Sequence, residues 1–516
     1  MTAIPTTATG PVVVALAVPD LAALLSALLV VANIVICVLA LGVIPGGRRP
    51  ATGMAWLILV LAAPFLGILL FLLFGSTNVE RRRHQKQLRA NERIQEYTAP
   101  IAELRQETPR LTYLASVARL NRHLGSLPAV GGNSAQFYPG YADSIQAMAD
   151  AIDQATEFVH AEFYITAWDE VTAPFFEAMV RATERDVDVR LLFDHLGSRG
   201  IPVYKDMLER LKATKIDWRP MMPIAPLHGR MRRPDLRNHR KILVVDGLVA
   251  FAGSQNMIEA SYNKPKNQKA GRAWVELVVR LQGPVVQALD AVFLTDWYSE
   301  TDEVLGIRAP APVLTGASSD GRPSDVLTPE VVGNLVAQVV PSGPGFVTEN
   351  NLRMFNTLLY SAQERISLTS PYFVPDESLL YAVTTAAQRG VAVELFVSAE
   401  GDQFMVYHAQ RSYYEALLRA GVRIYLYPAP SVLHSKHFTI DDDVAVIGSS
   451  NMDMRSFALN YEVSLMLLGP EVVARMRAVE DTYRSVSREL TLEEWEQRSR
   501  GSRYVDNVMR LTAALQ

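Results

Sequence analysis

Two stretches of this chain repeat six residues at identical spacing, in the pattern His-x-Lys-x4-Asp-x6-Gly-Ser-x-Asn. In an extended strand, residues i and i+2 point to the same face, so each copy presents an imidazole beside an ammonium group. We call each copy a cassette. The first cassette consists of His239, Lys241, Asp246, Gly253, Ser254 and Asn256, and the second of His434, Lys436, Asp441, Gly448, Ser449 and Asn451.

If both cassettes face one cavity, they form an anion site suited to phosphoryl transfer. The lysines and the asparagine amides can neutralise charge on the phosphoryl oxygens without a metal ion. One histidine can attack phosphorus to form a phosphohistidine, while the other protonates the departing alcohol and later deprotonates the acceptor. The sequence does not indicate which histidine is the nucleophile. We expect neither a metal nor any other cofactor.

The remaining cassette residues have more than one interpretation. Asp246 is followed by glycine, which is a hairpin signal, so Asp246 and Asp441 either stabilise a turn or salt bridge or take part in catalysis. Both alternatives stay open. Ser254 and Ser449 are expected to brace the site through hydrogen bonds rather than act as nucleophiles.

The elements around the cassettes are also duplicated. Six fixed positions arise by chance roughly once in 10⁷ to 10⁸ starting points, so two copies indicate duplication. In each half, a β-rich run, a helix, a second β-rich run, a second helix and a third run precede the cassette; EFVHAEFYI and VDVRLLFD correspond to ERISLTSPYF and VAVELFVS. This order predicts an α/β fold of two similar lobes packed about a pseudo-twofold axis.

The paired cassettes resemble those of the phospholipase D superfamily, whose members build one active site from two such motifs. The extension GSSNMDMRSFALNYE after the second cassette, together with AGVRIYLYP and LHSKHFTID, is similar to the bacterial cardiolipin synthases of that superfamily. The resemblance covers nearly the whole chain. It implies that Glu276 in AWVEL and Glu462 in ALNYE orient the histidines, although a solvated strand carboxylate remains an alternative for Glu276.

The same resemblance implies a reaction: two phosphatidylglycerol molecules are condensed to cardiolipin with release of glycerol. The first cassette departs from the family in the arginine-rich run RMRRPDLRNHRK. Arg237 and Arg240 flank His239 there, and we expect them to contact a lipid headgroup; a solvated basic loop is the alternative for this run. Five aromatic residues are candidates for the wall of the site, although each is more often a core residue: Tyr164, Trp274, Tyr372, Phe373 and Tyr413.

Two uncharged runs near the amino terminus, residues 21–44 and 53–75, are each long enough to cross a membrane. They predict two transmembrane helices. The loop between them holds Arg48 and Arg49, whereas six basic residues follow the second run, so the positive-inside bias places both termini and the catalytic region in the cytoplasm. We expect a multi-pass protein of the bacterial inner membrane. The six basic residues, which could also bind anionic headgroups, are Arg81, Arg82, Arg83, Lys86, Arg89 and Arg93.

The composition agrees with a large, partly membrane-embedded chain. Its 516 residues carry 50 basic and 54 acidic side chains, a net charge of −4, and 49% are hydrophobic, which excludes a disordered polymer. One cysteine, Cys37, allows no internal disulfide. We predict a membrane region at 1–78, a basic connector at 79–125, a first lobe at 126–305, a linker at 306–328 and a second lobe with carboxy-terminal helices at 329–516.

Other functions of the same chemistry were compared with lipid transfer. A membrane-anchored phospholipase D would hydrolyse headgroups with the same cassettes, and its product would distinguish it. A tethered nucleic-acid phosphodiesterase should carry a basic groove with interleaved aromatic residues, which the sequence lacks outside the two basic runs. We therefore expect phosphatidylglycerol, other anionic phospholipids and the membrane as partners, and no nucleic acid. The oligomeric state is not indicated.

Overall fold

The computed structural model describes residues 21–46, 50–75, 81–98, 101, 112–224, 235–306, 331–346 and 349–512. The chain divides into two compact units, residues 1–78 and 79–516. Each unit is described by itself. The predicted linker, residues 306–328, lies almost wholly outside the described residues, and the predicted domain boundaries stay predictions.

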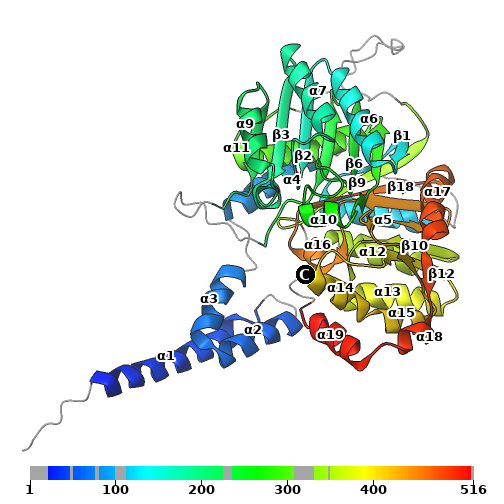
Figure 1. Cartoon of the computed structure of the whole chain (residues 1–516). Coiled ribbons are helices and arrows are strands. Elements are labelled where there is room, and N and C mark those ends of the chain that lie inside the picture. The colour runs from blue at the N-terminus through cyan, green and yellow to red at the C-terminus, as the bar shows by residue number, and fades with distance from the viewer. Residues whose placement is uncertain are drawn as a thin grey trace, which may run out of the picture. The chain divides into compact units, whose positions relative to one another are not determined.

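The first unit contains one helix of spanning length among its described residues. Helix α1, Leu21–Val43, is about 35 Å long and almost entirely apolar. Residues 53–75, predicted as one spanning helix, instead form two helices, α2 (Pro50–Ala62) and α3 (Pro64–Phe74). The break falls at Pro64, whose nitrogen has no hydrogen to donate and whose ring clashes with the carbonyl group four residues earlier. Neither helix is long enough alone, so a second transmembrane helix is not confirmed (Figure 1).

The second unit is built on one sheet of hydrogen-bonded strands. Among the described residues the order is β19-β13-β12-β10-β15-β16-β18-β9-β1-β8-β6-β5-β2-β3-β4. The antiparallel pair β9 and β1 lies at the centre of these 15 strands, and the six strands beyond β9 mirror the six beyond β1. Strand β19 (Arg488–Leu490) is an extra edge. This symmetry makes an α/β fold of two related lobes.

The strands of the first lobe are β1 (Ala129–Tyr138), β2 (Phe158–Phe163), β3 (Asp188–Asp194), β4 (Asp217–Met221), β5 (Lys241–Val245), β6 (Val249–Gly253) and β8 (Val278–Gln282). Those of the second lobe are β9 (Leu335–Ser342), β10 (Arg365–Thr369), β12 (Ala392–Ser398), β13 (Arg423–Tyr427), β15 (His437–Ile440), β16 (Val444–Gly448) and β18 (Glu462–Leu468). Figure 1 shows the first lobe in cyan and green and the second in yellow to red.

Helices cover both faces of the first-lobe strands. Leu243 and Val245 of β5 face a core shared with α6 (Tyr141–Asp153) and α7 (Ala173–Glu184), whereas Ile242 and Val244 face the opposite core, shared with α11 (Val285–Thr301). Because side chains alternate along a strand, β5 is apolar on both faces. The second lobe is covered in the same manner by α12 (Asn350–Ser361), α13 (Glu377–Gln388), α15 (Tyr414–Ala420) and α17 (Pro470–Val486).

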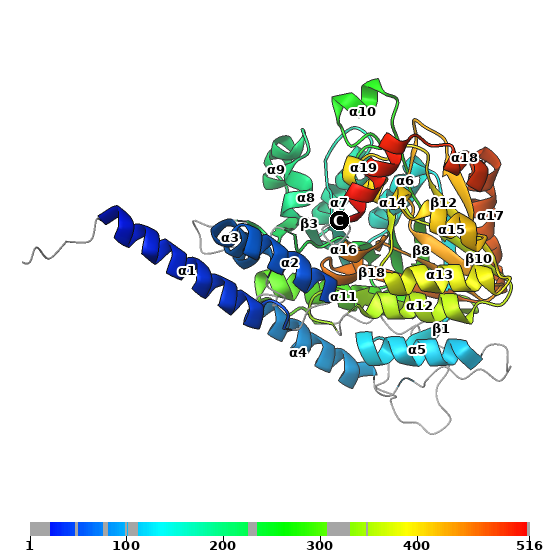
Figure 2. The same cartoon turned by 90° about the horizontal axis from the view of Figure 1, so that it is seen from below.

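The predicted basic connector is largely helical. Its first helix, α4 (Arg81–Thr98), lies alongside α11, and α5 (Thr112–Gly125) packs on α12 (Figure 2). Lys86 is buried and forms an ion pair with Asp302 at 2.7 Å, while Arg89 and Arg93 are exposed. Part of the basic cluster is therefore committed to the protein rather than available to headgroups.

Candidate active site

Short strand pairings between the lobes position the two histidines. Strand β14 (Val432–Leu433), just before His434, pairs in parallel with β7 (Trp274–Val275) of the first lobe. Asn238, just before His239, forms the corresponding bridge with Tyr461 of the second lobe. The backbone N–H of each histidine donates across the interface over 2.8 Å, from His239 to Tyr461 and from His434 to Val275. Each histidine thus enters the site where its own lobe meets the other.

The next residue of each partner strand is a glutamate, and each glutamate contacts the histidine of the other lobe. His239 Nδ1 lies 3.0 Å from both carboxylate oxygens of Glu462, and His434 Nδ1 lies 2.6 Å from Oε1 of Glu276. A carboxylate that accepts the Nδ1 hydrogen fixes the tautomer and leaves the Nε2 lone pair free. Each cassette histidine therefore takes its carboxylate partner from the other lobe.

Each lysine lies against the histidine of its own cassette, and the two cassettes contact each other through His239. Lys241 Nζ donates to the carbonyl oxygen of His239, and Lys436 Nζ donates to that of His434 at 2.6 Å and lies 3.3 Å from His434 Nε2. His239 Nδ1 also lies 3.1 Å from the carbonyl oxygen of Ser449, in the other cassette. Both histidines and both lysines are at most 8% exposed. The structure therefore gathers the predicted imidazoles and ammonium groups in one buried cluster.

Burial makes this cluster a poor place for positive charge unless an anion is present. It lowers the pKa of His239 to about 4, of Lys241 to about 7 and of Lys436 to about 8, and it lowers the pKa of His434 as well. Burial alone would raise the pKa of Glu462, but the neighbouring His239 and Lys241 bring it below its usual value. A bound phosphodiester would return the favourable interactions that the buried lysines lose on leaving water.

Known proteins match this chain over most of its length. A family model described as "Cardiolipin synthase, PLD-like domain" matches residues 148–297 and 355–481. "Cardiolipin synthase A" of Proteus mirabilis is 30% identical, with 87% of this chain and 90% of that protein covered. "Cardiolipin synthase A" of Yersinia pseudotuberculosis is 31% identical, with 87% and 90% covered. The chain belongs to the cardiolipin synthase family. The solved phosphatidylserine synthase of Haemophilus influenzae, 14% identical with a TM-score of 0.57 over 77% of this chain and 99% of that one, shares the fold.

The cassette serines of this cardiolipin synthase family member hold the glutamate-bearing strands. Ser449 Oγ donates to Glu462 at 2.5 Å and accepts the backbone N–H of Val463 at 3.0 Å. Ser254 Oγ accepts the N–H of Leu277, next to Glu276, at 3.0 Å. These contacts suit the predicted bracing task.

The cassette asparagines are both buried. Asn256 accepts the backbone N–H of Ile165 at 3.2 Å and donates to the Tyr262 hydroxyl at 2.7 Å. Asn451 Oδ1 has no hydrogen-bond partner among the described residues. Their contact with phosphate stays a prediction.

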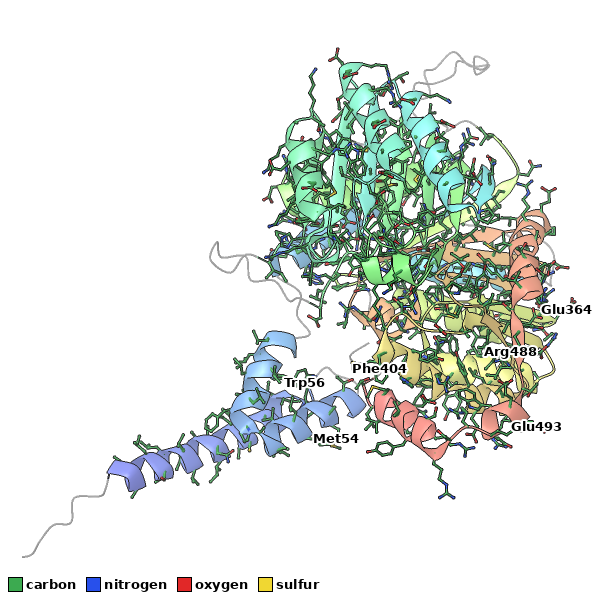
Figure 3. The ribbon with its side chains drawn as sticks, viewed as in Figure 1. Met54, Trp56, Glu364, Phe404, Arg488 and Glu493 are labelled. Carbon is green, nitrogen blue, oxygen red and sulfur yellow. The ribbon has the colours of Figure 1, made fainter. Side chains whose placement is uncertain are left out.

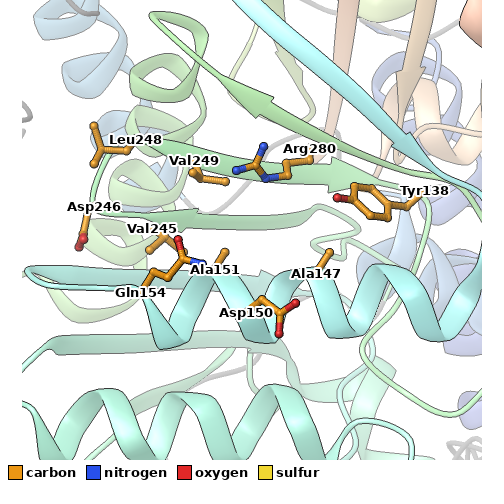
Figure 4. A pocket seen from close by; sticks show the side chains of 10 residues that line it. All are labelled: Tyr138, Ala147, Asp150, Ala151, Gln154, Val245, Asp246, Leu248, Val249 and Arg280. Carbon is orange, nitrogen blue, oxygen red and sulfur yellow. The ribbon is translucent and has the colours of Figure 1, made fainter. Parts of the chain in front are cut away.

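The cassette aspartates lie at the other end of the cassette strands. Asp246 accepts the backbone N–H groups of Thr156, Glu157 and Phe158 at 2.8–2.9 Å, and Asp441 accepts those of residues 363–365 at the same distances. Strand β5, which is about 16 Å long, lies between His239 and Asp246. A hollow of about 260 Å³ lies at this far end, beside Asp246 (Figure 4). Of the two interpretations, the geometry favours anchoring of the turn over catalysis.

The arginines that flank His239 point into the protein. Arg237 is 1% exposed and contacts Asp194 and the carbonyl oxygen of Met222, 3.2 Å away. Arg240 is also 1% exposed, pairs with Asp296 and donates to the carbonyl oxygen of Glu462 at 3.0 Å. These partners give both guanidinium groups a positioning task, and the predicted headgroup contact gains no support. The other arginines of this run, Arg230, Arg232 and Arg233, lie outside the described residues.

A buried ionic network behind His239 was missed by sequence reasoning. Asn238 Nδ2 donates to Glu162 at 2.6 Å and to Asp296 at 3.1 Å, and Asp296 also pairs with Arg240. Burial and the nearby charge of Asp296 raise the pKa of Glu162 well above its usual value. The available signal was an acidic residue inside the apolar run EFVHAEFYI. Its partner on α11, Asp296, is also an acidic residue in an apolar run, but it lies more than 130 positions later and no spacing links the two.

Two of the five aromatic candidates touch the histidines. The ring of Tyr164 lies edge to face with His239 at 4.9 Å, and that of Tyr372 with His434 at 6.1 Å. Trp274 packs on Tyr262, and the other two candidates, Phe373 and Tyr413, belong to the core of the second lobe.

Proposed function

We propose that this protein is a membrane-bound phosphatidyltransferase that condenses two phosphatidylglycerol molecules to cardiolipin and glycerol through a covalent phosphohistidine. The observation that carries the proposal is the pair of buried histidines, each held at Nδ1 by a glutamate of the other lobe, beside two buried lysines. Family membership supports phospholipid synthesis.

The reaction proceeds by two displacements at phosphorus. Nε2 of one histidine attacks the phosphorus of the first phosphatidylglycerol, a nitrogen–phosphorus bond forms, and the bond to the glycerol oxygen breaks. The other histidine gives a proton to that oxygen. The primary hydroxyl of the second phosphatidylglycerol then loses its proton to the same histidine and attacks phosphorus, which frees the first histidine.

The surrounding groups lower the barrier by electrostatics and orientation. Lys241 and Lys436 stabilise the charge on the phosphoryl oxygens, and Glu276 and Glu462 stabilise the imidazolium forms that appear in each displacement. The phosphohistidine forms in a site that is nearly closed to water, which favours an alcohol acceptor over hydrolysis.

The membrane supplies the substrate. Helix α1 anchors the chain in the bacterial inner membrane, and the basic residues after residue 80 favour a cytoplasmic catalytic unit. Phosphatidylglycerol and other anionic phospholipids of that leaflet are the proposed partners. Tethering keeps the site beside a substrate that does not dissolve in water.

Purified full-length protein with phosphatidylglycerol vesicles tests this function. We expect cardiolipin and glycerol without an activated nucleotide lipid, and phosphatidic acid as the sole lipid product would indicate a phospholipase D instead. His239→Ala or His434→Ala should abolish turnover, whereas His123→Ala on the exposed face of α5 should not. Appreciable turnover in either active-site variant would contradict a shared site. Phosphate trapped on one of the two histidines would identify the nucleophile.

A further inference from the structure

The rim of the site beside His434 carries a hydrogen-bonded group of polar side chains. The Tyr372 hydroxyl donates to Asp402, at 3.0 and 2.9 Å from its two oxygens, and accepts from Gln403 Nε2 at 2.8 Å. Tyr372 follows β10 and Asp402 follows β12, two neighbouring parallel strands. Their carboxyl ends meet at the same edge, where α/β sheets commonly bind ligands. Figure 3 labels Phe404, which directly follows Gln403 and begins α14 (Phe404–Arg411).

The Asp402 carboxylate has capacity for further donors. A carboxylate offers about four lone-pair sites, and one phenol hydroxyl occupies only part of them. Asp402 is partly exposed, and within the described residues no lysine or arginine forms an ion pair with it. Burial, and after it the charge of Asp402, raises the pKa of Tyr372 well above 10, so the phenol keeps its hydrogen and remains a donor.

The charge of Asp402 reaches the second cassette. Burial lowers the pKa of Lys436 to about 8, and Asp402 is among the carboxylates that oppose this decrease; it also opposes the decrease at His434. A negative group beside a phosphate site is unfavourable for the phosphate itself. It is favourable for a part of the substrate that donates hydrogen bonds.

The carboxylate at the end of the neighbouring strand in the first lobe has no such open capacity. Asp194, at the end of β3, is fully buried and accepts the N–H groups of Leu196 and Gly197, both at 2.9 Å. It also lies 3.5 Å from Arg237. The carboxylate on the His239 side is therefore saturated by protein donors, whereas the one on the His434 side is not.

We propose that Asp402, Tyr372 and Gln403 bind the vicinal hydroxyl groups of a glycerol headgroup. This inference rests on the proposed function. Two adjacent hydroxyls can donate to the carboxylate, and the amide of Gln403 can donate to a hydroxyl oxygen. The site holds both free hydroxyls of the departing glycerol in the first displacement. In the second displacement it holds the one hydroxyl of the acceptor headgroup that does not react, while the reacting hydroxyl donates to His434.

The proposal assigns roles to the histidines. Because the glycerol oxygen lies beside His434, His434 Nε2 gives the proton to the departing glycerol and later takes the proton of the acceptor hydroxyl. His239 Nε2 then forms the bond to phosphorus in the first step and is released in the second. Water has no second hydroxyl to donate to Asp402. A glycerol headgroup that does so therefore competes with water for the phosphohistidine.

The test compares acceptors in the full-length protein. Wild type, Asp402→Ala and Tyr372→Phe receive phosphatidylglycerol vesicles with and without added ethanol, and cardiolipin, phosphatidylethanol and phosphatidic acid are quantified. Glu400→Ala is the matched control, because Glu400 lies in the same loop, is 66% exposed and contacts only Arg272, 3.8 Å away, among the ion pairs of the described residues.

We expect Asp402→Ala to lower the ratio of cardiolipin to phosphatidic acid by roughly tenfold or more, with a smaller fall in Tyr372→Phe. The ratio of phosphatidylethanol to phosphatidic acid should stay within about twofold of wild type, because ethanol has no vicinal hydroxyl. Unchanged product ratios, or an equal fall with both alcohols, would overturn the proposal. A wild type that forms no cardiolipin would refute the proposed function instead.

Discussion

The two half-sites share a histidine, a lysine and a glutamate, but they differ behind their histidines. The residue between histidine and lysine is Arg240 in the first cassette and Ser435 in the second. Arg240 enters a buried network with Asp296, whereas Ser435 makes one hydrogen bond of 3.2 Å to the Tyr483 hydroxyl. The first half-site is thus supported by buried charge and the second by a neutral pair.

Strand geometry explains why the residue between histidine and lysine can differ between the two cassettes. Histidine and lysine alternate with the residue between them, so that residue faces α11 or α17 and never the substrate. The two cassettes share the reactive residues and differ in the packing behind them. Buried charge is costly unless every partner is present, so the first half-site should be the more sensitive to single substitutions behind it.

The largest expected effect concerns the glutamates that contact the histidines, and here the two half-sites should behave alike. Glu462→Gln and Glu276→Gln each leave a hydrogen-bonding side chain but misorient the imidazole, so kcat for cardiolipin formation should fall on the order of 10³-fold in both. The double variant should lose little more. Steady-state kinetics on phosphatidylglycerol vesicles measure this, with Glu209→Gln at an exposed position as control. Near-normal kcat in one variant would break the equivalence.

The second prediction concerns the residue between histidine and lysine, where the two half-sites should differ. Arg240→Ala leaves Asp296 and its neighbours without their main counter-charge and should lower the free energy of unfolding by about 3–5 kcal/mol. Ser435→Ala should lower it by less than about 1.5 kcal/mol. Thermal unfolding of the detergent-solubilised protein compares the two. Equal losses would show that the ionic network adds no special sensitivity.

Helix α4 extends the first network and gives the third prediction. Arg83 is buried, pairs with Glu300 and lies 4.8 Å from the centre of the Tyr461 ring, the residue before Glu462. Arg83→Ala should therefore lower kcat roughly tenfold through misplaced Glu462, and Arg83→Lys should recover part of it.

Arg89→Ala is the control for Arg83→Ala, because it removes the same charge from the same helix at an exposed position. If the basic cluster acted only through anionic lipid or topology, both variants would change activity alike. A loss confined to Arg83→Ala supports positioning.

The sequence predicted what local spacing determines and missed what depends on contacts between distant segments. The cassettes, their duplication and the two-lobed α/β order follow from strand periodicity. Each glutamate contacts the histidine of the other lobe: Glu276 contacts His434, and Glu462 contacts His239. This arrangement depends on pairing between the lobes, which residue spacing does not indicate. Arg240 was expected at a headgroup because it flanks His239; its partner Asp296 lies 56 positions later, and no spacing indicates that contact. The apolar character of residues 53–75 predicted one helix, but the structure has two helices there, with the break at Pro64.

The smallest expected effect separates the two lysines by pH. Burial lowers the pKa of Lys241 to about 7 and of Lys436 to about 8, from 10.5 for both. The folded state therefore holds fewer protons than the unfolded state from about pH 7 to 10.5, and stability should rise with pH across that window. Anion affinity has the opposite trend, because it needs the charged ammonium groups.

Sulfate reports this trend, since its charge is constant over the range. Its affinity for the wild type, measured by titration calorimetry, should begin to fall near pH 7. In Lys241→Met the fall should begin near pH 8, where Lys436 loses its proton. In Lys436→Met it should begin above pH 7, because the charge of Lys436 is one of the causes that lower the pKa of Lys241. His239, with a pKa of about 4, adds no step above pH 6. Sulfate affinity that is constant from pH 6 to 9 would remove this difference between the half-sites and would leave the residues behind the histidines as the feature that distinguishes them.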